Sequence, residues 1–277
     1  MRIYSLSKVL ALPVILLLFG ILYLEYGLRI STGYWILLPT VLGVVLFISH
    51  GNIDFWFVKK YPIKLDKEVV DLLDRYIPFY RNLSAADQQT YRERMSIYIA
   101  GRSFKSVGSE MKDVPYDIRA MIATCAIQVG YYQDDILIGD FDRIFVYKHP
   151  FGSPRFKFLH TVETEVEDGV LIFSLEQMMP GITNPELYYN IGMHGYVDAF
   201  FKANPAAPFP NTIKASWLDV LAISGHSQKN ILATIGYENT DLLVVLATCY
   251  FTYPKAFTEK LPELSKEFDL LFGKSKL

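Results

Sequence analysis

The sequence predicts an α+β protein in which a transmembrane hairpin of two helices precedes a mainly helical domain with a small β-sheet. Three observations predict this class: two uncharged apolar runs within the first sixty residues, helical periodicity in most of the later chain, and short β-branched runs near its middle. The 277 residues are 51% hydrophobic and 20% charged, which is too apolar for a disordered chain. We therefore divide the chain into a hairpin, residues 1–60, and a domain, residues 61–277.

The two apolar runs are Val9–Leu24 and Trp35–Ser49, separated by a short polar stretch. A helix needs about 20 apolar residues to cross the hydrocarbon core of a bilayer, and the tyrosine and tryptophan residues beside both runs suit the membrane interface. We expect the chain to contact the membrane over residues 9–58. A cleaved signal peptide is the alternative for the first run, but no small-residue cleavage site follows Leu24.

Lysine and arginine residues predict the orientation of the hairpin. The outer flanks of the two runs hold Arg2, Lys8, Lys59, Lys60 and Lys64, whereas the connecting loop holds only Arg29. Because basic flanks stay in the cytoplasm, both termini are expected there, with the hairpin in the inner (cytoplasmic) membrane and the domain facing the cytoplasm. Beyond the first sixty residues, 22 basic residues stand against 27 acidic ones, so no nucleic acid partner is expected.

The elements expected in the domain follow from periodicity and from capping residues. Ser84 is a typical N-cap, and Pro78 is expected to end the first helix. The expected helices are Asp66–Ile77, Ser84–Phe104, Tyr116–Tyr132, Pro185–Lys202, Ser216–Leu221, Asn239–Tyr253 and Leu261–Phe272, and the expected strands are Arg143–Tyr147, Gly169–Phe173 and part of Phe156–Val166. The order is helices, a small sheet and helices again, which is typical of the α+β class.

The segment Gly169–Phe201, GVLIFSLEQMMPGITNPELYYNIGMHGYVDAFF, resembles the active-site segment of the MtfA-like zinc peptidases. In that family a strand leads through a glycine-containing loop to a helix that carries HExxH. Further segments, LSAADQQTYRERMSIYIAGRSF, IRAMIATCAIQVGYY, DRIFVYKHPF and DLLVVLATCYFTYPKAFTEKLPELSKEFDLLF, are similar to other parts of the family in the expected order and cover most of Lys67–Gly273. The resemblance implies a zincin-like domain, to which the hairpin is an addition.

In HExxH, two histidines one helical turn apart hold Zn²⁺, and the glutamate activates a bound water. Here the motif position reads HGYVD: His194 matches the first ligand, Gly195 replaces the general base, and Asp198 replaces the second histidine. Asp241 on a later helix matches the position of the ligand glutamate, and Thr248 replaces a second acidic residue. The resemblance thus implies a degenerate metal site, formed by His194, Asp198 and Asp241, with no catalytic residue.

Loss of the glutamate removes general-base catalysis, which is typically worth about 10²–10⁴-fold in rate. We therefore expect no peptidase activity by this mechanism and no cofactor, with zinc left open because an imidazole and two carboxylates still form a mixed ligand set. Apart from the resemblance, a lone His194 on an apolar helix is more often a core histidine bonded to a carboxylate. In this second interpretation, Asp198 and Asp241 pair with His194 or with lysines such as Lys202 and have no role in metal binding.

The other candidate residues are interpreted as structural. His149, His160 and His226 lie in turn-like sequences and are expected at the surface, and His50 is expected where the second apolar helix ends. The acidic run DDILIGDFD lacks the spacing and the distal glutamate of an EF-hand and is interpreted as a solvated turn.

The leading functional hypothesis is a membrane-anchored, catalytically inactive relative of the MtfA-type peptidases that acts as a protein-binding or assembly module. It would recruit a protein partner or peptide segment through an inherited cleft and a strand edge. Alanine or glutamate in place of Gly195 should then leave function intact.

Two alternatives belong to other classes. One is an active metallopeptidase with a rearranged metal site, in which Glu176 or Glu186 replaces the base. The other is a structural subunit of a membrane protein complex, in which the faces around Gly20, Gly27 and Gly43 permit helix packing.

Overall fold

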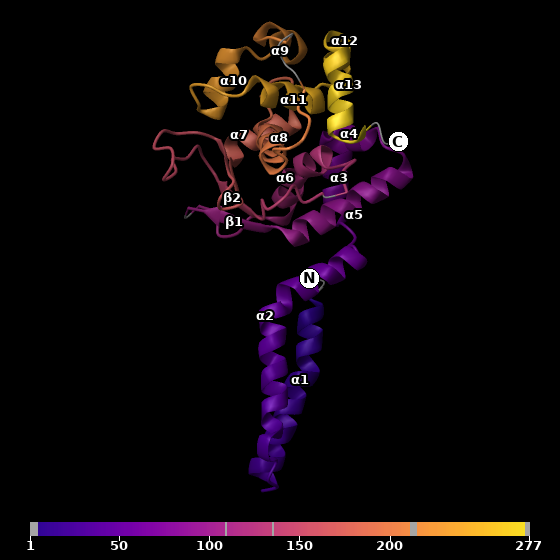
Figure 1. Ribbon diagram of the computed structural model, residues 1–277, viewed down its shortest axis with the longest axis vertical. Helices are drawn as coiled ribbons and strands as arrows, with labels where there is room; N and C mark the ends of the chain where they lie inside the picture. The colour runs from indigo at the N-terminus through magenta and orange to yellow at the C-terminus, as the bar shows by residue number, and fades with distance from the viewer. Residues whose placement is uncertain (1–4, 109, 135, 211–214, 275–277) are drawn as a thin grey trace. The chain divides into compact units, whose positions relative to one another are not determined.

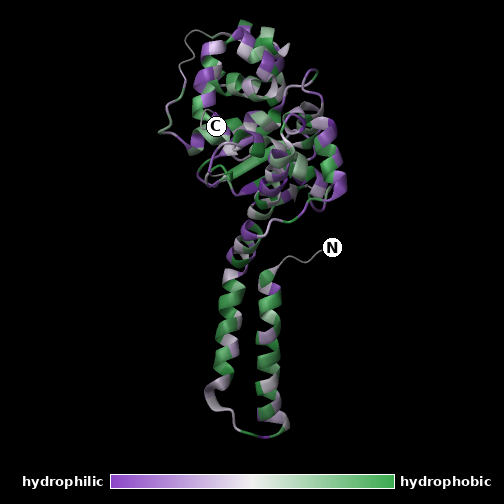
Figure 2. Cartoon of the chain, turned by 90° about the vertical axis from the view of Figure 1, so that its right-hand side faces the viewer, coloured by the Kyte–Doolittle hydropathy of each residue, from purple (hydrophilic) through white to green (hydrophobic). Residues whose placement is uncertain are grey.

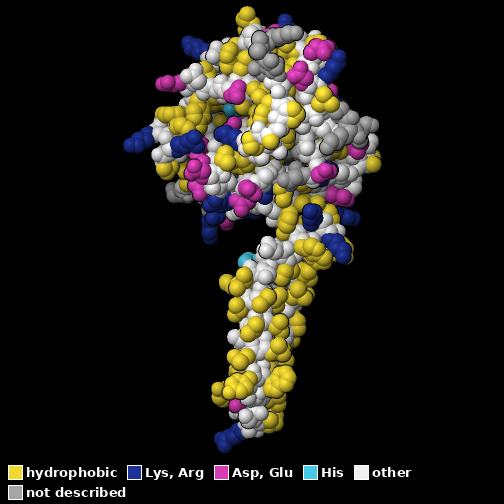
Figure 3. Space-filling model, in the orientation of Figure 1, with side chains coloured by type: hydrophobic (Ala, Val, Ile, Leu, Met, Phe, Trp, Pro, Cys, Tyr) yellow, Lys and Arg dark blue, Asp and Glu magenta, His cyan; other side chains and the backbone are white. Residues whose placement is uncertain are grey.

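The computed structural model describes residues 5–274 except 109, 135 and 211–214. The chain divides into two compact units, Met1–Lys64 and Leu65–Leu277. Within the described residues the protein is mostly helical, with one small mixed sheet of four strands. The space-filling view shows hydrophobic side chains over the first unit and charged side chains of both signs spread over the second (Figure 3).

The first unit is an antiparallel hairpin of α1 (Leu6–Leu22) and α2 (Leu37–Lys60), which lie side by side (Figure 1). A π-helical turn, Tyr23–Gly27, extends α1, and a 3₁₀ turn, Gly33–Ile36, precedes α2. Hydrophobic residues line both helices along most of their length (Figure 2). With these turns, both helices are long and apolar enough to cross a membrane.

The second helix of the hairpin differs from the expectation at its C-terminal end. It continues to Lys60, so His50 lies inside α2 and not at its end as predicted. One acidic side chain of α2 joins the two helices: Asp54 accepts hydrogen bonds from the backbone N–H of Ser7 at 2.8 Å and from the hydroxyls of Ser5 and Ser7 at 2.7 and 2.8 Å. The first N–H groups of a helix have no partner within it, and Asp54 supplies the partner for one of these groups, the Ser7 N–H of α1.

The sheet of the second unit has the strand order β1-β2-β4-β3. Its strands are β1 (Ser103–Val107), β2 (Arg143–Tyr147), β3 (Val162–Glu165) and β4 (Val170–Ser174). The first two strands and β4 are parallel, whereas β3 lies at an edge and pairs antiparallel with β4, with Val162 opposite Phe173. The strands expected at 143–147 and 169–173 are confirmed within one residue, and the segment 156–166 supplies β3.

The other regular elements of the second unit are helices. They are α3 (Lys67–Tyr76), α4 (Pro78–Arg81), α5 (Ala85–Gly101), α6 (Tyr116–Val129), α7 (Leu175–Thr183), α8 (Ile191–Ala203), α9 (Trp217–Ser224), α10 (Gln228–Ile235), α11 (Leu242–Thr252), α12 (Pro254–Lys260) and α13 (Pro262–Leu271). Ser84 caps α5 as expected, since its side chain accepts a hydrogen bond from the Asp87 N–H.

Several boundaries predicted for this unit were wrong. The helix expected over 84–104 ends at Gly101, and the next residues form β1, so a strand precedes α6 and the sheet is not continuous in the sequence. The helix expected from Pro185 begins only at Ile191, because Asn190 caps it by accepting a hydrogen bond from the Met193 N–H. Four helices, α4, α7, α10 and α12, were not predicted, whereas the last expected helix, 261–272, matches α13 within one residue at each end.

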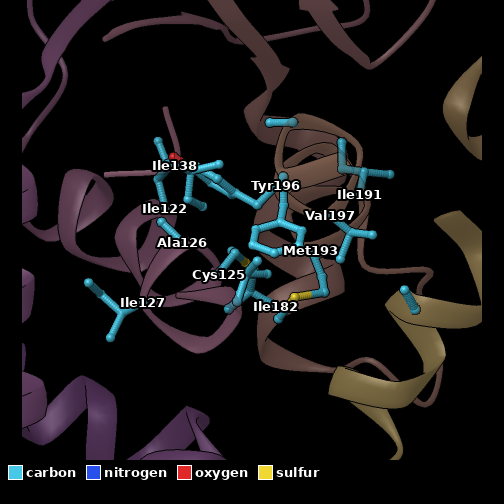
Figure 4. Close-up of a cluster of buried hydrophobic side chains, with 14 of the residues drawn as sticks. Ile122, Cys125, Ala126, Ile127, Ile138, Ile182, Ile191, Met193, Tyr196 and Val197 are labelled. Carbon is cyan, nitrogen blue, oxygen red and sulfur yellow. The ribbon is translucent and has the colours of Figure 1, made fainter. Parts of the chain in front are cut away.

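Helix α8 is the central element of the second unit. It contacts α6, α7 and α11 as well as β3 and β4, and most of its residues are buried. Figure 4 shows its side chains Met193 and Tyr196 packed among Cys125 and Ala126 of α6. The hydroxyl of Tyr196 also accepts a hydrogen bond from the Tyr98 hydroxyl of α5 at 2.9 Å. The residues of the HGYVD segment are therefore held by packing on several sides.

Candidate functional site

A cavity of about 180 Å³ lies where α8, β3 and the N-terminus of α11 meet. It is lined by Arg155, Phe156, Val162, Glu163, Thr164, His194, Asp198, Lys202, Tyr237, Asn239, Thr240, Asp241 and Val244. The three residues of the predicted degenerate metal site, His194, Asp198 and Asp241, all line this one cavity. We call it the α8 cavity.

The sequence places these three residues in simple ways. His194 and Asp198 are four residues apart on α8, so they project from the same face. Asp241 is the N-cap of α11, and its carboxylate accepts a hydrogen bond from the Leu243 N–H at 2.8 Å. Thr248, further along α11, is buried, and its hydroxyl donates to the Val244 carbonyl within the helix.

His194 is almost completely buried, with 6% of its surface exposed. Its Nδ1 is 2.9 Å from the hydroxyl of Tyr189, which is the natural donor to a neutral imidazole. Burial lowers the pKa of His194 to about 4, and the charge of Lys202 acts in the same direction while Asp198 opposes both. The side chain is therefore neutral at pH 7.

The carboxylate of Asp198 is engaged with neighbours other than His194. Lys202, one turn further along α8, places its Nζ 2.7 Å from Asp198 Oδ2, and the Thr164 hydroxyl of β3 donates to the same oxygen. The interpretation that Asp198 pairs with Lys202 is thus confirmed. Asp241, as the cap of α11, uses its carboxylate on the backbone.

The donor set does not fit a metal centre as it stands. Among the residues that the structure describes, no group of three His, Cys, Asp or Glu side chains is placed to hold a metal ion. Protein zinc sites need three or four converging donors, whereas here one carboxylate bonds to a lysine and a threonine and the other to a helix N-terminus.

Gly195, at the position where the resemblance predicts a general base, packs closely against the sheet. A Cβ atom added at Gly195 would lie 2.6 Å from Cε1 of Phe173 and 2.8 Å from Cγ2 of Val162. Real Cβ atoms do not approach carbon so closely, so even alanine requires these buried side chains to move. The glycine therefore lets α8 pack directly on β3 and β4. The prediction that alanine or glutamate at this position leaves function intact stays a prediction, but either substitution is expected to disturb the packing.

Glu163 also lines the α8 cavity, and sequence reasoning did not select it. Its carboxylate is 2.9 Å from Nε2 of His160, and both side chains are buried. The other ring nitrogen of His160 is 3.0 Å from the Phe158 carbonyl. The rings of Phe151 and Tyr237 pack on the imidazole, at 4.4 and 5.4 Å between centroids.

Two predictions of surface histidines were consequently wrong. His160 is fully buried between aromatic rings and bonds to Glu163. His226 is only 8% exposed, and its Nε2 donates a hydrogen bond to the Pro185 carbonyl at 3.0 Å. His149 is exposed as expected and lies 2.8 Å from Glu176. The nearby Phe156 and Phe158 are the feature of the sequence that could have indicated a buried His160 imidazole.

The edge of the sheet beside the cavity is capped by side chains. The Ser174 N–H donates a hydrogen bond to the Thr161 carbonyl, so Thr161 directs its backbone groups toward β4. Along an antiparallel strand, successive residues direct their backbone groups to opposite sides. The N–H and C=O groups of Val162 and Thr164 therefore point away from β4. The Tyr237 hydroxyl donates to the Val162 carbonyl at 3.0 Å, and Lys202 Nζ donates to the Thr164 carbonyl at 3.2 Å. Both outward carbonyls of this edge are therefore already hydrogen-bonded.

The glutamates that could have replaced the base lie elsewhere. Neither Glu176 nor Glu186 lines the α8 cavity. Glu176 pairs with His149, and about half of its side chain is exposed.

No protein-family model matches the chain, and no curated protein matches it. The likeness of the HGYVD segment to HExxH therefore rests on the residues of this chain alone.

Proposed function

We propose that this protein is a membrane-anchored, non-catalytic relative of the MtfA-type zinc peptidases whose α8 cavity binds a segment of a protein partner. The observation that carries the proposal is the packing of Gly195. A helix with HExxH spacing presents His194 to a cavity, yet the position of its general base is occupied by Phe173 and Val162. This supports a peptidase scaffold kept for binding, because no carboxylate fits where water would be activated.

The charges of the cavity favour a partner segment with a basic side chain. The acidic lining residues are Glu163, Asp198 and Asp241, and the basic ones are Arg155 and Lys202. Lys202 pairs with Asp198, and Arg155 lies 2.6 Å from Glu165 outside the cavity, which holds the pKa of that carboxyl below its usual range. Glu163 is engaged with His160, so Asp241 is the carboxylate that a lysine or arginine of the partner would complement.

The edge of β3 gives such a segment a second set of contacts. Strand addition uses the outward backbone groups of an edge strand, and here the Val162 and Thr164 carbonyls are capped by Tyr237 and Lys202. In the proposed complex, backbone N–H groups of the partner replace these two side chains. Capping keeps the edge closed to other chains while the partner is absent.

The location proposed with this function is the inner membrane, with the second unit in the cytoplasm. Its support is the excess of basic residues on the outer flanks of the two apolar helices.

Metal analysis separates this proposal from an active metallopeptidase. We expect purified full-length protein to carry substoichiometric zinc and to show no chelator-sensitive cleavage of a casein substrate. Stoichiometric zinc that is lost in His194→Ala, together with peptidase activity, would overturn the proposal.

A crosslinking experiment tests the binding role. A photoreactive phenylalanine analogue at Asn239, in the cavity lining, should crosslink one protein in intact cells, and Asp241→Lys should abolish that product. The matched controls are the same analogue at exposed Glu259 and the substitution Glu259→Lys. A product that persists in Asp241→Lys would contradict binding at this cavity.

The alternative of a structural subunit in a membrane complex is favoured by one feature of the hairpin. A Cβ atom added at Gly20 or Gly43 meets no atom within 4 Å among the described residues, which leaves room for another helix to approach. A stable larger assembly after detergent extraction, unchanged by Asp241→Lys, would support this role instead.

A further inference from the structure

A second cavity, of about 260 Å³, lies in the second unit between the α3–α4 junction, α6, the segment before α8 and the α11–α12 junction. Its lining consists of Tyr76, Ile77, Pro78, Phe79, Asn82, Leu83, Thr124, Cys125, Gln128, Tyr132, Ile182, Pro185, Asn190, Met193, Phe251, Thr252 and Pro254. We call it the α6 cavity. It shares no described lining residue with the α8 cavity, although α8 contributes to both.

The lining of the α6 cavity contains no charged residue among those described. Aliphatic and aromatic side chains form most of its wall, and Figure 4 shows three of them, Cys125, Ile182 and Met193, close together. Burial raises the pKa of the Cys125 thiol to about 12, so this cysteine is an apolar part of the wall at pH 7. A charged ligand would lose its hydration here without gaining a counter-charge.

Two polar side chains in this wall retain hydrogen-bonding capacity. The buried Thr252 Oγ1 has no hydrogen-bond partner among the described residues. Asn190 is 7% exposed, and its Oδ1 accepts from the Met193 N–H, whereas no described residue accepts from its amide nitrogen. Gln128 also lines the cavity and is partly buried. Buried polar groups are nearly always satisfied in native proteins, so the buried Thr252 hydroxyl marks a place where a ligand supplies a partner.

We propose that the α6 cavity binds a neutral, largely apolar organic molecule that carries a hydroxyl or carbonyl group. Its apolar body packs against the aromatic wall, and its polar group bonds to Thr252 and Asn190. Small-molecule sites in proteins have this composition: concave and mostly apolar, with a few convergent polar groups. This inference does not depend on the partner proposed for the α8 cavity.

The test uses full-length protein in lipid nanodiscs and a pair of probes that differ in charge. Naphthylmethanol is neutral and carries a hydroxyl, whereas naphthoate has the same ring system and a negative charge. Equilibrium dialysis, with binding to empty nanodiscs subtracted, should show one saturable site per chain for naphthylmethanol and none for naphthoate. Equal binding of the two probes, or no saturable site for either, would overturn the proposal.

Two variants locate the site. Gln128→Trp fills the cavity and should abolish saturable binding, whereas Gln89→Trp, at an exposed position of α5, should leave it unchanged. If Gln128→Trp does not fold, Thr252→Val still tests the site. Loss of one hydrogen bond should weaken the affinity for naphthylmethanol about two- to tenfold and leave the affinity for naphthalene unchanged. Binding that is unchanged in Gln128→Trp, or naphthylmethanol affinity that is unchanged in Thr252→Val, would place the ligand elsewhere and refute the inference.

Discussion

Gly195 combines an expected role with an observed one. In the sequence it stands where the resemblance to HExxH predicts a general base, and in the fold it is the point where α8 touches Phe173 and Val162. The sequence could predict the first role from the HGYVD pattern. It could not predict the second, because the contact joins residues that lie 22 and 33 positions away in the chain.

Substitutions at Gly195 should therefore destabilise the protein. Alanine gains about 1 kcal/mol in helix propensity, but overpacking a buried contact costs about 1–3 kcal/mol, so Gly195→Ala should lower the melting temperature modestly. Gly195→Glu adds a buried carboxylate and should lower it far more. Thermal unfolding of full-length protein measures both, with Gly20→Ala, where the added methyl meets no described atom, as the control.

A second substitution checks the cause. Combining Gly195→Ala with Phe173→Leu removes the ring atom that the new methyl would meet, so the two changes should be less destabilising together than the sum of each alone. Simple additivity would contradict the proposed contact.

His194 should make stability depend on pH. Its folded-state pKa, about 4, lies below the unfolded value of about 6.5, so the unfolded chain takes up the proton first as the pH falls. Its contribution is fully present above pH 6.5 and is lost between pH 6.5 and 4, with a loss of about 2 kcal/mol at pH 5.

Denaturant unfolding at pH 7.5 and pH 5 measures this effect. His194→Asn should lose less stability on acidification than the parent protein. If the free energy of unfolding depends on pH in the same way for the parent and for His194→Asn, burial does not lower the pKa of His194.

At the scale of elements, the edge strand β3 is the part of the site that sequence reasoning described least well. Tyr237 donates its hydroxyl to the outward carbonyl of Val162. Tyr237→Phe should lower the free energy of unfolding by about 1 kcal/mol, because it leaves that carbonyl without its partner, and should increase light scattering on concentration because the edge is freed. Tyr188→Phe, at an exposed tyrosine, should change neither quantity.

The elements that were predicted are those with a strong local signal. The apolar face of α6, the Ser84 cap of α5 and the β-branched runs of β2 and β4 all lie within a few residues of sequence. Pro180 inside α7 concealed that helix, because proline is typical of helix ends. Helix α10 is too short for its periodicity to reveal it, but the residues at its two ends were usable signals. Ser227 caps its N-terminus, and Gly236, which adopts a positive φ, ends it.

Strand β1 was missed for a different physical reason. Its residues follow α5 after a single intervening position, and none of its side chains is fully buried. Its strand conformation comes from pairing with β2, 40 residues later in the chain. Pairing between distant segments is a tertiary effect that local propensity does not report.

For the whole molecule, the two buried cysteines make the proposed topology easy to test. Cys125 and Cys249 are both buried, and burial raises the pKa of each thiol to about 12, so neither should react with a maleimide in the folded protein. Ser31→Cys, in the turn between the apolar helices, should be labelled by a membrane-impermeant maleimide in intact cells whose outer membrane has been permeabilised. Lys255→Cys, exposed in the second unit, should be labelled only after the inner membrane is opened.

The reverse labelling pattern would mean that the second unit faces away from the cytoplasm. Labelling of the parent protein before denaturation would show that its native thiols are accessible and would require their replacement first.

The bonds from Asp54 to Ser5 and Ser7 have a consequence for biosynthesis. Asp54 is translated some fifty residues after the Ser5 and Ser7 groups that bond to it. With the hairpin in the proposed membrane location, we therefore expect the two helices to insert as a pair, because the start of the first helix lacks this carboxylate until the second span has left the ribosome.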